Sequence, residues 1–555
     1  MNDRIRSGIP RIAKPKARFA PGADIPLSWV RGARKKSVTE RRLDIAINSL
    51  RAIFCCIILY LLFLSLHGDF EKRKRPEGSG GARPQRADIV DRNGQPLAVN
   101  LPTIDLWANT KNLVAPDESA RALARILPEL EYGDAIAKLR SGKGFVYLAR
   151  NVAPAVREKV LLIGEPGLEF AETGHRFYPQ GSLFSHIVGA VDVDNNGISG
   201  VEKYLDENGM SRVREPVRLS VDIYVQDAMR QNLARAMKDY GAKTAAGITM
   251  DVKSGEILGM VSLPDFYGKD AGKAASSALY NNHATTDVFE IGSVMKIFNH
   301  ALAIESRYPA KKTFNVCNPF AIGGHKVRDS HPRKCVIDMR EAFILSSNIA
   351  AATIARELGS ERQREFFRKL GFFSRANLEL PERGAPMFPK KWDDNVNQSA
   401  AYGYGISISL LHTIAAAGAI INDGMYVPPT ILKRREGEAP RSHQAVRLST
   451  SEEMKRLMRL AVTDGTGRMA NLADIKTGGK TGTSYKMEGG KYNERKIRTF
   501  FVSVFPIDDP KYIMAVMLDE ADNDGCTLAS CTAVPASKKI IEEIGPTLNL
   551  DIAGR

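Results

Sequence analysis

Residues 288–305 read VFEIGSVMKIFNHALAIE, a stretch that places Ser293 and Lys296 at the start of a helical pattern. Positions three apart on a helix share a face, so the spacing predicts that the lysine amine lies beside the serine hydroxyl. Burial would lower the pKa of the amine and let its neutral form accept the serine proton, as a base beside a nucleophile. The helix N-terminus would direct N–H groups towards a developing oxyanion.

The S-x-x-K spacing is a weak signal alone. About one or two chance matches are expected in a chain of this length, and most would be a serine and a lysine on the surface. The assignment of a nucleophile therefore depends on what else the sequence contains.

A second motif, Ser346-Ser347-Asn348, follows the apolar residues 342–345. From a loop between helices, Ser346 and Asn348 could both reach into a cleft. The hydroxyl could pass on a proton, and the amide could hold a peptide group of a substrate. The alternative interpretation is a helix cap or an Asx turn.

The third motif is Lys480-Thr481-Gly482-Thr483, which indicates a strand edge. Gly482 would let a ligand approach the backbone, and the lysine and threonines would together bind a carboxylate. A similar triplet, K-T-G, occupies residues 476–478 but lacks the following threonine, so we prefer the second copy. The alternative is a glycine-rich hairpin turn.

The ordered set is far more specific than any of its members. S-x-x-K, then S-x-N, then K-T-G-T nearly reproduces the motif set of penicillin-binding proteins and class A β-lactamases. On these residues the chain resembles class B penicillin-binding proteins, most closely the division type called FtsI. The resemblance extends to residues 86–98 (RADIVDRNGQPLA), 251–266 (DVKSGEILGMVSLPDF) and 402–409 (YGYGISIS).

Two positions depart from the family pattern. Ile291 stands where the family usually has proline before Gly-Ser, and Leu410 stands where proline is frequent. We expect both to change the entry into a helix more than the chemistry.

The resemblance implies a reaction. Ser293 would attack the carbonyl between the two terminal D-Ala residues of a peptidoglycan stem peptide, and Lys296 would take its proton. Ser346 would pass a proton to the leaving D-Ala with Lys480 nearby, and Asn348 would hold the donor peptide.

The resemblance also implies which residues bind the donor carboxylate and the oxyanion, and how the second stem peptide reacts. Thr481 and Thr483 would bind the terminal carboxylate, and the backbone N–H groups of Ser293 and Thr483 would form the oxyanion hole. The side-chain amine of a second stem would then attack the acyl-enzyme and form the cross-link. β-Lactams would mimic the donor, and neither a metal nor an organic cofactor would be required.

The N-terminal region predicts a membrane anchor. Residues 1–51 carry thirteen Lys or Arg and four Asp or Glu, so they hold more than half of the chain's net charge of +16. Residues 52–68 then contain no charged side chain, which favours a single transmembrane helix over 45–68 with the N-terminus in the cytoplasm. The leading segment is too long for the n-region of a cleaved signal peptide. The membrane also explains the basic tail better than nucleic acid does.

These features predict a multidomain α/β (α+β) protein of the bacterial inner membrane with a periplasmic catalytic domain. We expect a cytoplasmic tail (1–44), a transmembrane helix (45–68) and a linker (69–85). A β-rich pedestal, similar to a penicillin-binding protein dimerisation domain, would follow at 86–232. A transpeptidase domain with a central antiparallel sheet flanked by helices would occupy 233–555.

The resemblance implies an FtsW-type membrane polymerase as partner, along with other division proteins. The rival functions are an elongation-type class B transpeptidase, a D,D-carboxypeptidase or β-lactamase, and a β-lactam-binding scaffold.

Four cysteines would face an oxidising compartment. Cys526 and Cys531 could form a short disulfide loop or remain thiols. His325, His331 and Cys335 only faintly resemble metal ligands, so we predict no metal site.

Overall fold

The computed structural model of the chain describes residues 47–58, 86–266, 281–329, 332 and 334–550. They belong to two units, Met1–Gly81 and Ala82–Arg555. In the first unit, residues 47–58 form a helix with exposed side chains. No helix in the described parts of the chain is both long and apolar enough to cross a membrane. The rest of the expected span, the tail and the linker lie outside the described residues.

The second unit begins with a sheet built on one long strand. β2 (Pro96–Ala108) pairs antiparallel with β4 (Leu168–Phe177) and with β3 (Val146–Val152), and a short β1 (Ile89–Val90) extends the sheet. The turn between β1 and β2 contains Gly94 with φ +88°, as the Asn-Gly pair favours.

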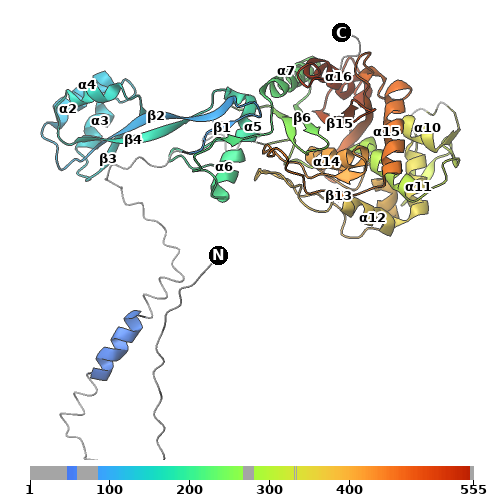
Figure 1. Ribbon diagram of the computed structural model, residues 1–555, viewed down its shortest axis with the longest axis horizontal. Helices are drawn as coiled ribbons and strands as arrows, with labels where there is room; N and C mark the ends of the chain where they lie inside the picture. Colours follow the sequence, from blue (N-terminus) through green and yellow to red (C-terminus); the bar gives the residue numbers. More distant parts are fainter. Residues whose placement is uncertain (1–46, 59–85, 267–280, 330–331, 333, 551–555) are drawn as a thin grey trace, which may run out of the picture. The chain divides into compact units, whose positions relative to one another are not determined.

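Three helices cover the far end of this sheet (Figure 1). They are α2 (Pro116–Ile126), α3 (Tyr132–Leu139) and α4 (Val156–Leu161). Leu106 of β2 and Leu123 of α2 are buried in a small core that includes residues of all three helices. The pedestal therefore has a hydrophobic core at this end.

A buried charge network closes the other end of the pedestal. Glu202 of α6 (Gly200–Glu207) is fully buried and accepts hydrogen bonds from Arg86 Nε at 2.9 Å and Arg176 Nε at 2.6 Å. Arg86 also pairs with Asp206 at 2.9 Å. Glu202 thus neutralises two arginines that come from distant strands and loops.

Replacing Glu202 with glutamine should lower the free energy of unfolding by about 3–5 kcal/mol, because two buried guanidinium groups lose their shared carboxylate. Urea unfolding of the purified protein would measure the loss. Glu207→Gln on the same helix is the matched control, since Glu207 is exposed and pairs with Lys203 only at 4.0 Å. Equal stabilities for the two variants would contradict the prediction.

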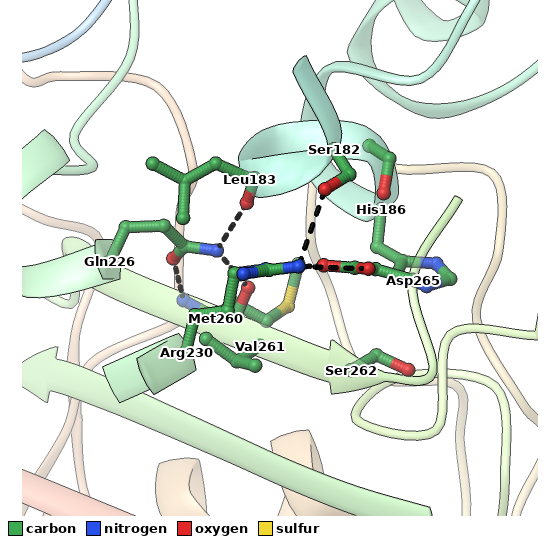
Figure 2. A pocket seen from close by; sticks show the side chains of 10 residues that line it. Ser182, Leu183, His186, Gln226, Arg230, Met260, Val261, Ser262 and Asp265 are labelled. Carbon is green, nitrogen blue, oxygen red and sulfur yellow. Dashed lines mark hydrogen bonds and ion pairs between the residues drawn. The ribbon is translucent and has the colours of Figure 1, made fainter. Parts of the chain in front are cut away.

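Side chains of α7 (Ile223–Asp239) join the segment around Leu183 to the strand that contains Met260. Gln226 donates to the carbonyls of Leu183 at 3.0 Å and Met260 at 2.8 Å, and accepts from the Met260 N–H at 2.8 Å. Figure 2 shows this amide between the two segments, with Arg230 directed at Asp265 and Ser182. The expected domain boundary at residues 232–233 lies within this helix and stays a prediction.

The second large sheet is antiparallel throughout, in the order β14-β15-β16-β6-β7. The strands are β6 (Thr244–Asp251), β7 (Ile257–Leu263), β14 (Gly478–Glu488), β15 (Lys491–Phe505) and β16 (Tyr512–Asp519). An early hairpin is therefore completed by three late strands. The predicted mixed α/β fold with a central antiparallel sheet is confirmed.

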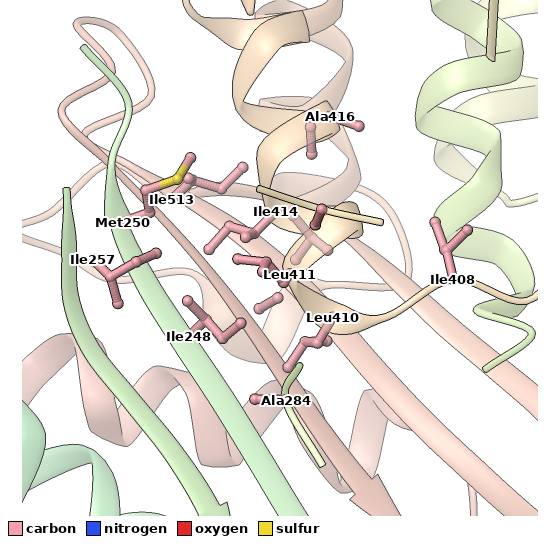
Figure 3. Close-up of a cluster of buried hydrophobic side chains, with 14 of the residues drawn as sticks. Ile248, Met250, Ile257, Ala284, Ile408, Leu410, Leu411, Ile414, Ala416 and Ile513 are labelled. Atoms are coloured by element: carbon pink, nitrogen blue, oxygen red, sulfur yellow. The ribbon is translucent and has the colours of Figure 1, made fainter. Parts of the chain in front are cut away.

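Helices cover both faces of this sheet (Figure 1). Along β16, Ile513 and Ala515 belong to the core beneath α14 (Leu410–Ile421), whereas Met514 and Val516 belong to the core beneath α7 and α16 (Ala533–Ile544). This alternation is the period-two pattern of a strand that is buried on both sides. Figure 3 shows Leu411 and Ile414 of α14 against Ile248, Met250 and Ile513.

Leu410 is the first residue of α14, which Ser409 caps by accepting the His412 N–H. The first helical position needs no N–H partner within the helix, so it accepts proline as readily as the leucine found here. Every residue of α14 is buried, as expected for a helix that is apolar on all faces.

Candidate active site

Ser293 lies in a tight turn that leads directly into a helix. The turn is the 3₁₀ helix η4 (Gly292–Met295), and α9 (Lys296–Glu305) follows at once. Lys296 Nζ donates a hydrogen bond of 2.7 Å to Ser293 Oγ. The structure therefore brings the first predicted pair together.

Two glycines let this turn pack against β14. Gly292 has φ +53°, and a Cβ built on it would lie 2.2 Å from the carbonyl oxygen of Thr483. A Cβ on Gly482 would lie 2.5 Å from the carbonyl oxygen of Ile291. Because neither position has room for a side chain, the backbones next to Ser293 and at Thr483 lie against each other.

Lys296 is completely buried and surrounded by acceptors. Besides Ser293, its amine donates to the Ser346 carbonyl at 2.8 Å and to Asn348 Oδ1 at 2.7 Å. Burial lowers the pKa of Lys296 to about 7, although the charge of Asp329 opposes the shift. A large fraction of the amine is therefore neutral near neutral pH and able to accept a proton.

Ser346 stands between two lysines. It occupies the turn between α10 (Met339–Ile344) and α11 (Asn348–Leu358), with φ +60°. Its Oγ accepts from Lys480 Nζ at 2.9 Å and from Lys296 Nζ at 3.2 Å. Burial, together with the charge of Lys296, lowers the pKa of Lys480 well below its usual value. A proton could pass between the two amines through this hydroxyl.

The two K-T-G triplets are clearly distinguished by position. Lys480 is buried at the site, whereas the Lys476 side chain is 65% exposed and pairs with Asp508 at 2.6 Å. Thr481 Oγ1 shares a hydrogen bond of 2.7 Å with Thr466, and Thr483 Oγ1 accepts from the N–H of residue 529 at 3.3 Å. The preferred copy is the one that adjoins Ser346.

Asp329 is a residue of the site that the sequence reasoning missed. It follows β10 (His325–Val327), and its carboxylate accepts from Ser347 Oγ at 2.5 Å and from the Asn348 N–H at 2.6 Å. It also accepts from the Ile349 N–H at 3.1 Å. Asp329 thus caps α11 and fixes the S-x-N motif, and no local spacing could have signalled a partner 18 residues away.

Replacing Asp329 with asparagine should shift the pH dependence of acylation to lower pH. The Asp329 charge raises the pKa of Lys296, so removing it lowers this pKa and makes the neutral amine available in more acidic solution. Asparagine keeps one oxygen that can accept from the Asn348 and Ile349 N–H groups, so the stability should change little. Stopped-flow acylation by a chromogenic β-lactam from pH 5 to 9, with melting curves, would measure both effects.

Asp338→Asn is the matched control for this prediction. Asp338 also caps a helix, α10, but from the N-cap position of that helix, where it accepts from the Glu341 N–H at 2.8 Å. We expect Asp338→Asn, which also keeps a capping oxygen, to be nearly as stable as the wild type and to show no shift of the acylation profile. If both variants kept the wild-type pH dependence of acylation, Asp329 would only cap α11 and would not influence the pKa of Lys296.

Two disulfides lie beside the site motifs. Cys317–Cys335 closes the loop that carries Asp329, a pairing that the sequence did not predict. The sequence left the pairing of Cys526 and Cys531 open, and the structure joins them in a disulfide. A backbone N–H of the loop between them donates a hydrogen bond to Thr483 Oγ1.

Because it is in a disulfide, Cys335 is not available as a metal ligand. His331 lies outside the described residues, and the described ones include no His/Cys/Asp/Glu group arranged to hold a metal.

Known proteins resemble the chain over most of its length. The family profile "Penicillin binding protein transpeptidase domain" matches residues 245–542, and "Penicillin-binding Protein dimerisation domain" matches residues 82–208. The probable peptidoglycan D,D-transpeptidase FtsI of Caulobacter vibrioides is 33% identical over 495 residues, covering 85% of this chain and 84% of that protein. The peptidoglycan D,D-transpeptidase FtsI of Escherichia coli is 25% identical over 500 residues, covering 84% of each.

Solved structures share the fold. Penicillin binding protein 3 from Mycobacterium tuberculosis, complexed with aztreonam, aligns with a TM-score of 0.66 and 24% identity. The alignment covers 85% of this chain and 98% of that one.

Proposed function

This chain belongs to the penicillin-binding protein transpeptidase family, and we propose that it is a peptidoglycan D,D-transpeptidase acting through an acyl-enzyme on Ser293. The observation that carries this proposal is the hydrogen bond of 2.7 Å between Ser293 Oγ and a fully buried amine whose pKa is about 7. A nucleophile and a base in hydrogen-bond contact are the minimum for acyl transfer.

The first half of the reaction forms the acyl-enzyme. Lys296 takes the Ser293 proton as Oγ attacks the carbonyl carbon between the two terminal D-Ala residues. The N–H groups of Ser293 and Thr483 hold the oxyanion, a role that the close backbone contact between Gly292 and Thr483 supports. Ser346, in contact with both lysines, passes the proton to the leaving D-Ala nitrogen as the C–N bond breaks.

The other motif residues position the substrates. Thr481 and Thr483, with Lys480, bind the terminal carboxylate of the donor, and Asn348 holds its peptide backbone. An amine of a second stem peptide then attacks the acyl carbon, which transfers the acyl group and frees Ser293. A β-lactam enters by the same first step and remains as the acyl-enzyme.

The cellular setting belongs to the same proposal. Similarity to two FtsI proteins favours cell division and septal wall over the elongation role. The charge-free run at 52–68 favours a single-pass anchor in the inner membrane, with residues 86–232 as a periplasmic pedestal and 233–555 as the catalytic domain. An FtsW-type glycosyltransferase is the partner that would supply nascent glycan strands.

Two experiments separate this function from its rivals. The full chain, in detergent, incubated with a stem pentapeptide and an amine acceptor, should release D-Ala and form the cross-linked dimer. Release of D-Ala without dimer would favour a carboxypeptidase. Depletion in cells should give filaments, whereas rounded cells would favour the elongation role.

A further inference from the structure

A disulfide that the proposed reaction does not use lies next to one of the motif threonines. Cys526 and Cys531 are joined at a sequence separation of 5. Between them, the backbone N–H of Ala529 donates a hydrogen bond of 3.3 Å to Thr483 Oγ1. Thr483 is one of the threonines assigned to the terminal carboxylate of the donor. The loop that this disulfide closes is therefore in direct contact with the substrate-binding motif.

The hydrogen bond from Ala529 determines how the Thr483 hydroxyl can act. A hydroxyl offers one hydrogen and two lone pairs. The Ala529 N–H can only donate, so it occupies a lone pair of Thr483 Oγ1 and leaves the hydroxyl hydrogen free. A carboxylate can only accept, so it needs this hydrogen. The loop thus holds the Thr483 hydroxyl as the donor that carboxylate binding requires.

The same loop is fastened to the two strands of the motif. Asn523 Nδ2 donates to the carbonyl of Cys531 at 2.9 Å, just inside the loop. The next residue, Thr532, forms a hydrogen bond of 3.0 Å between its Oγ1 and Thr499 Oγ1. Thr499 stands opposite Thr483 in the pairing of β14 with β15. The loop therefore rests on both strands at the level of Thr483.

Overall stability explains this disulfide poorly. In the chain-entropy model a cross-link restricts the unfolded chain, and the effect grows with the length of the loop that it closes. The Cys526–Cys531 disulfide spans 5 residues, whereas Cys317–Cys335 spans 18. The shorter cross-link thus restricts the unfolded chain less. Its main effect is local, on the few residues that carry the Ala529 N–H.

Both cysteines of the pair are half-buried, so a thiol reductant can reach them. A thiolate of a dithiol attacks one sulfur, the S–S bond breaks, and the second thiol of the reductant resolves the mixed disulfide. Two electrons and two protons pass to the cysteine pair, which becomes two thiols, while the dithiol becomes a disulfide. The reaction is reversible, so the loop can be closed again by an oxidant of the same class.

We propose that the Cys526–Cys531 disulfide is a positioning element of the carboxylate site, and that affinity for the donor depends on its redox state. The inference rests on the proposed transpeptidase function, in which Thr483 binds the donor carboxylate. When the disulfide is intact, the Ala529 N–H stays on Thr483. When it is reduced, the loop loses this constraint and the Thr483 hydroxyl can turn its hydrogen away from the ligand. The reductant is a dithiol of the thiol–disulfide oxidoreductase class.

The experiment measures acylation of the full chain in detergent by benzylpenicillin, which carries a carboxylate. Cys55 and Cys56, the free cysteines, are replaced with serine in every sample so that only the paired cysteines react. Acylation rates over a range of concentrations give the dissociation constant and the limiting rate. After reduction by dithiothreitol and its removal without oxygen, the dissociation constant should rise about tenfold, with the limiting rate nearly unchanged. Reoxidation should restore it.

Four variants assign the effect. Cys317→Ser/Cys335→Ser keeps only the shorter disulfide and should still respond to the reductant. Cys526→Ser/Cys531→Ser should bind weakly from the start and should not respond. Thr483→Val should also bind weakly and lose the response, because the hydroxyl through which the loop acts is gone, whereas Thr483→Ser should retain it. A disulfide that served only stability would respond in the valine variant as well.

Equal dissociation constants for the oxidised and reduced chains would overturn the inference, as would a response that persists in Thr483→Val. If Cys526→Ser/Cys531→Ser folds poorly, reduction of the Cys317→Ser/Cys335→Ser protein still decides, because it leaves the sequence of the loop intact. An oxidised wild-type chain that benzylpenicillin does not acylate would instead contradict the proposed function. The two failures are therefore distinguishable.

Discussion

Replacing Ser293 with alanine is expected to abolish covalent labelling by a fluorescent penicillin, with a loss of acylation rate of about 10⁶-fold. The alanine variant lacks the oxygen that receives the hydrogen bond of 2.7 Å from Lys296. Without this oxygen the acyl bond cannot form, and only uncatalysed opening of the β-lactam ring remains. In-gel fluorescence and the intact mass of the full chain after incubation would measure the loss.

Ser346→Ala is the control for a hydroxyl in the same site. It should slow labelling by about 10²-fold or more, because proton transfer becomes less efficient, yet the adduct should still form on Ser293. Labelling of the Ser293→Ala protein at any serine would contradict the assignment of the nucleophile.

The Ser293→Ala protein should fold normally. Lys296 would keep the Ser346 carbonyl and Asn348 Oδ1 as acceptors, so no buried amine is left without a partner. An unchanged melting temperature would show that lost labelling reports chemistry and not unfolding.

The sequence sufficed where local patterns carry the information. The Asn-Gly turn before β2, the hairpin of β6 and β7, and the alternating late strands were each readable from short stretches. The assembly of the β6–β7 hairpin and the late strands into one sheet was predictable, because the exposed edge strand of a hairpin needs a hydrogen-bonding partner. The spacing of Ser293 and Lys296 likewise implied contact, since a single turn connects them.

The sequence was insufficient where contact depends on long loops. Asp329 reaches Ser347 from a loop that Cys317 and Cys335 close, and nothing in the spacing of these residues indicates their meeting. The sequence preferred Lys480 over Lys476 because a threonine follows its triplet. The fold was needed to show that Lys480 contacts Ser346 whereas Lys476 pairs with Asp508.

Replacing Lys296 with methionine is expected to reduce the acylation rate by about 10²–10⁴-fold, the usual contribution of a general base. The wild-type rate should rise about tenfold per pH unit below pH 7 and level off above it, because the neutral amine is the active form and its pKa is about 7. The methionine variant should lose this dependence. Rates of β-lactam acylation from pH 5 to 9 would measure both effects.

The Lys296→Met variant should be more stable than the wild type although it is less active. Its loss of activity could then not be attributed to misfolding. The folded-state pKa of Lys296 lies below its ordinary value of 10.5, so the unfolded chain binds more protons between pH 7 and 10.5. Stability therefore rises with pH across that window, and the cost of the buried charge is present at neutral pH. Methionine removes this cost, so the variant should melt at a higher temperature at pH 7.

Lys476→Met is the matched control, because it removes the same charge from an exposed lysine. It should leave the acylation rate, its pH profile and the melting temperature unchanged. If Lys296→Met were as active as wild type, the proton would have to leave Ser293 by another route. Lys480, in contact with Ser346 at 2.9 Å, would then be the base to test.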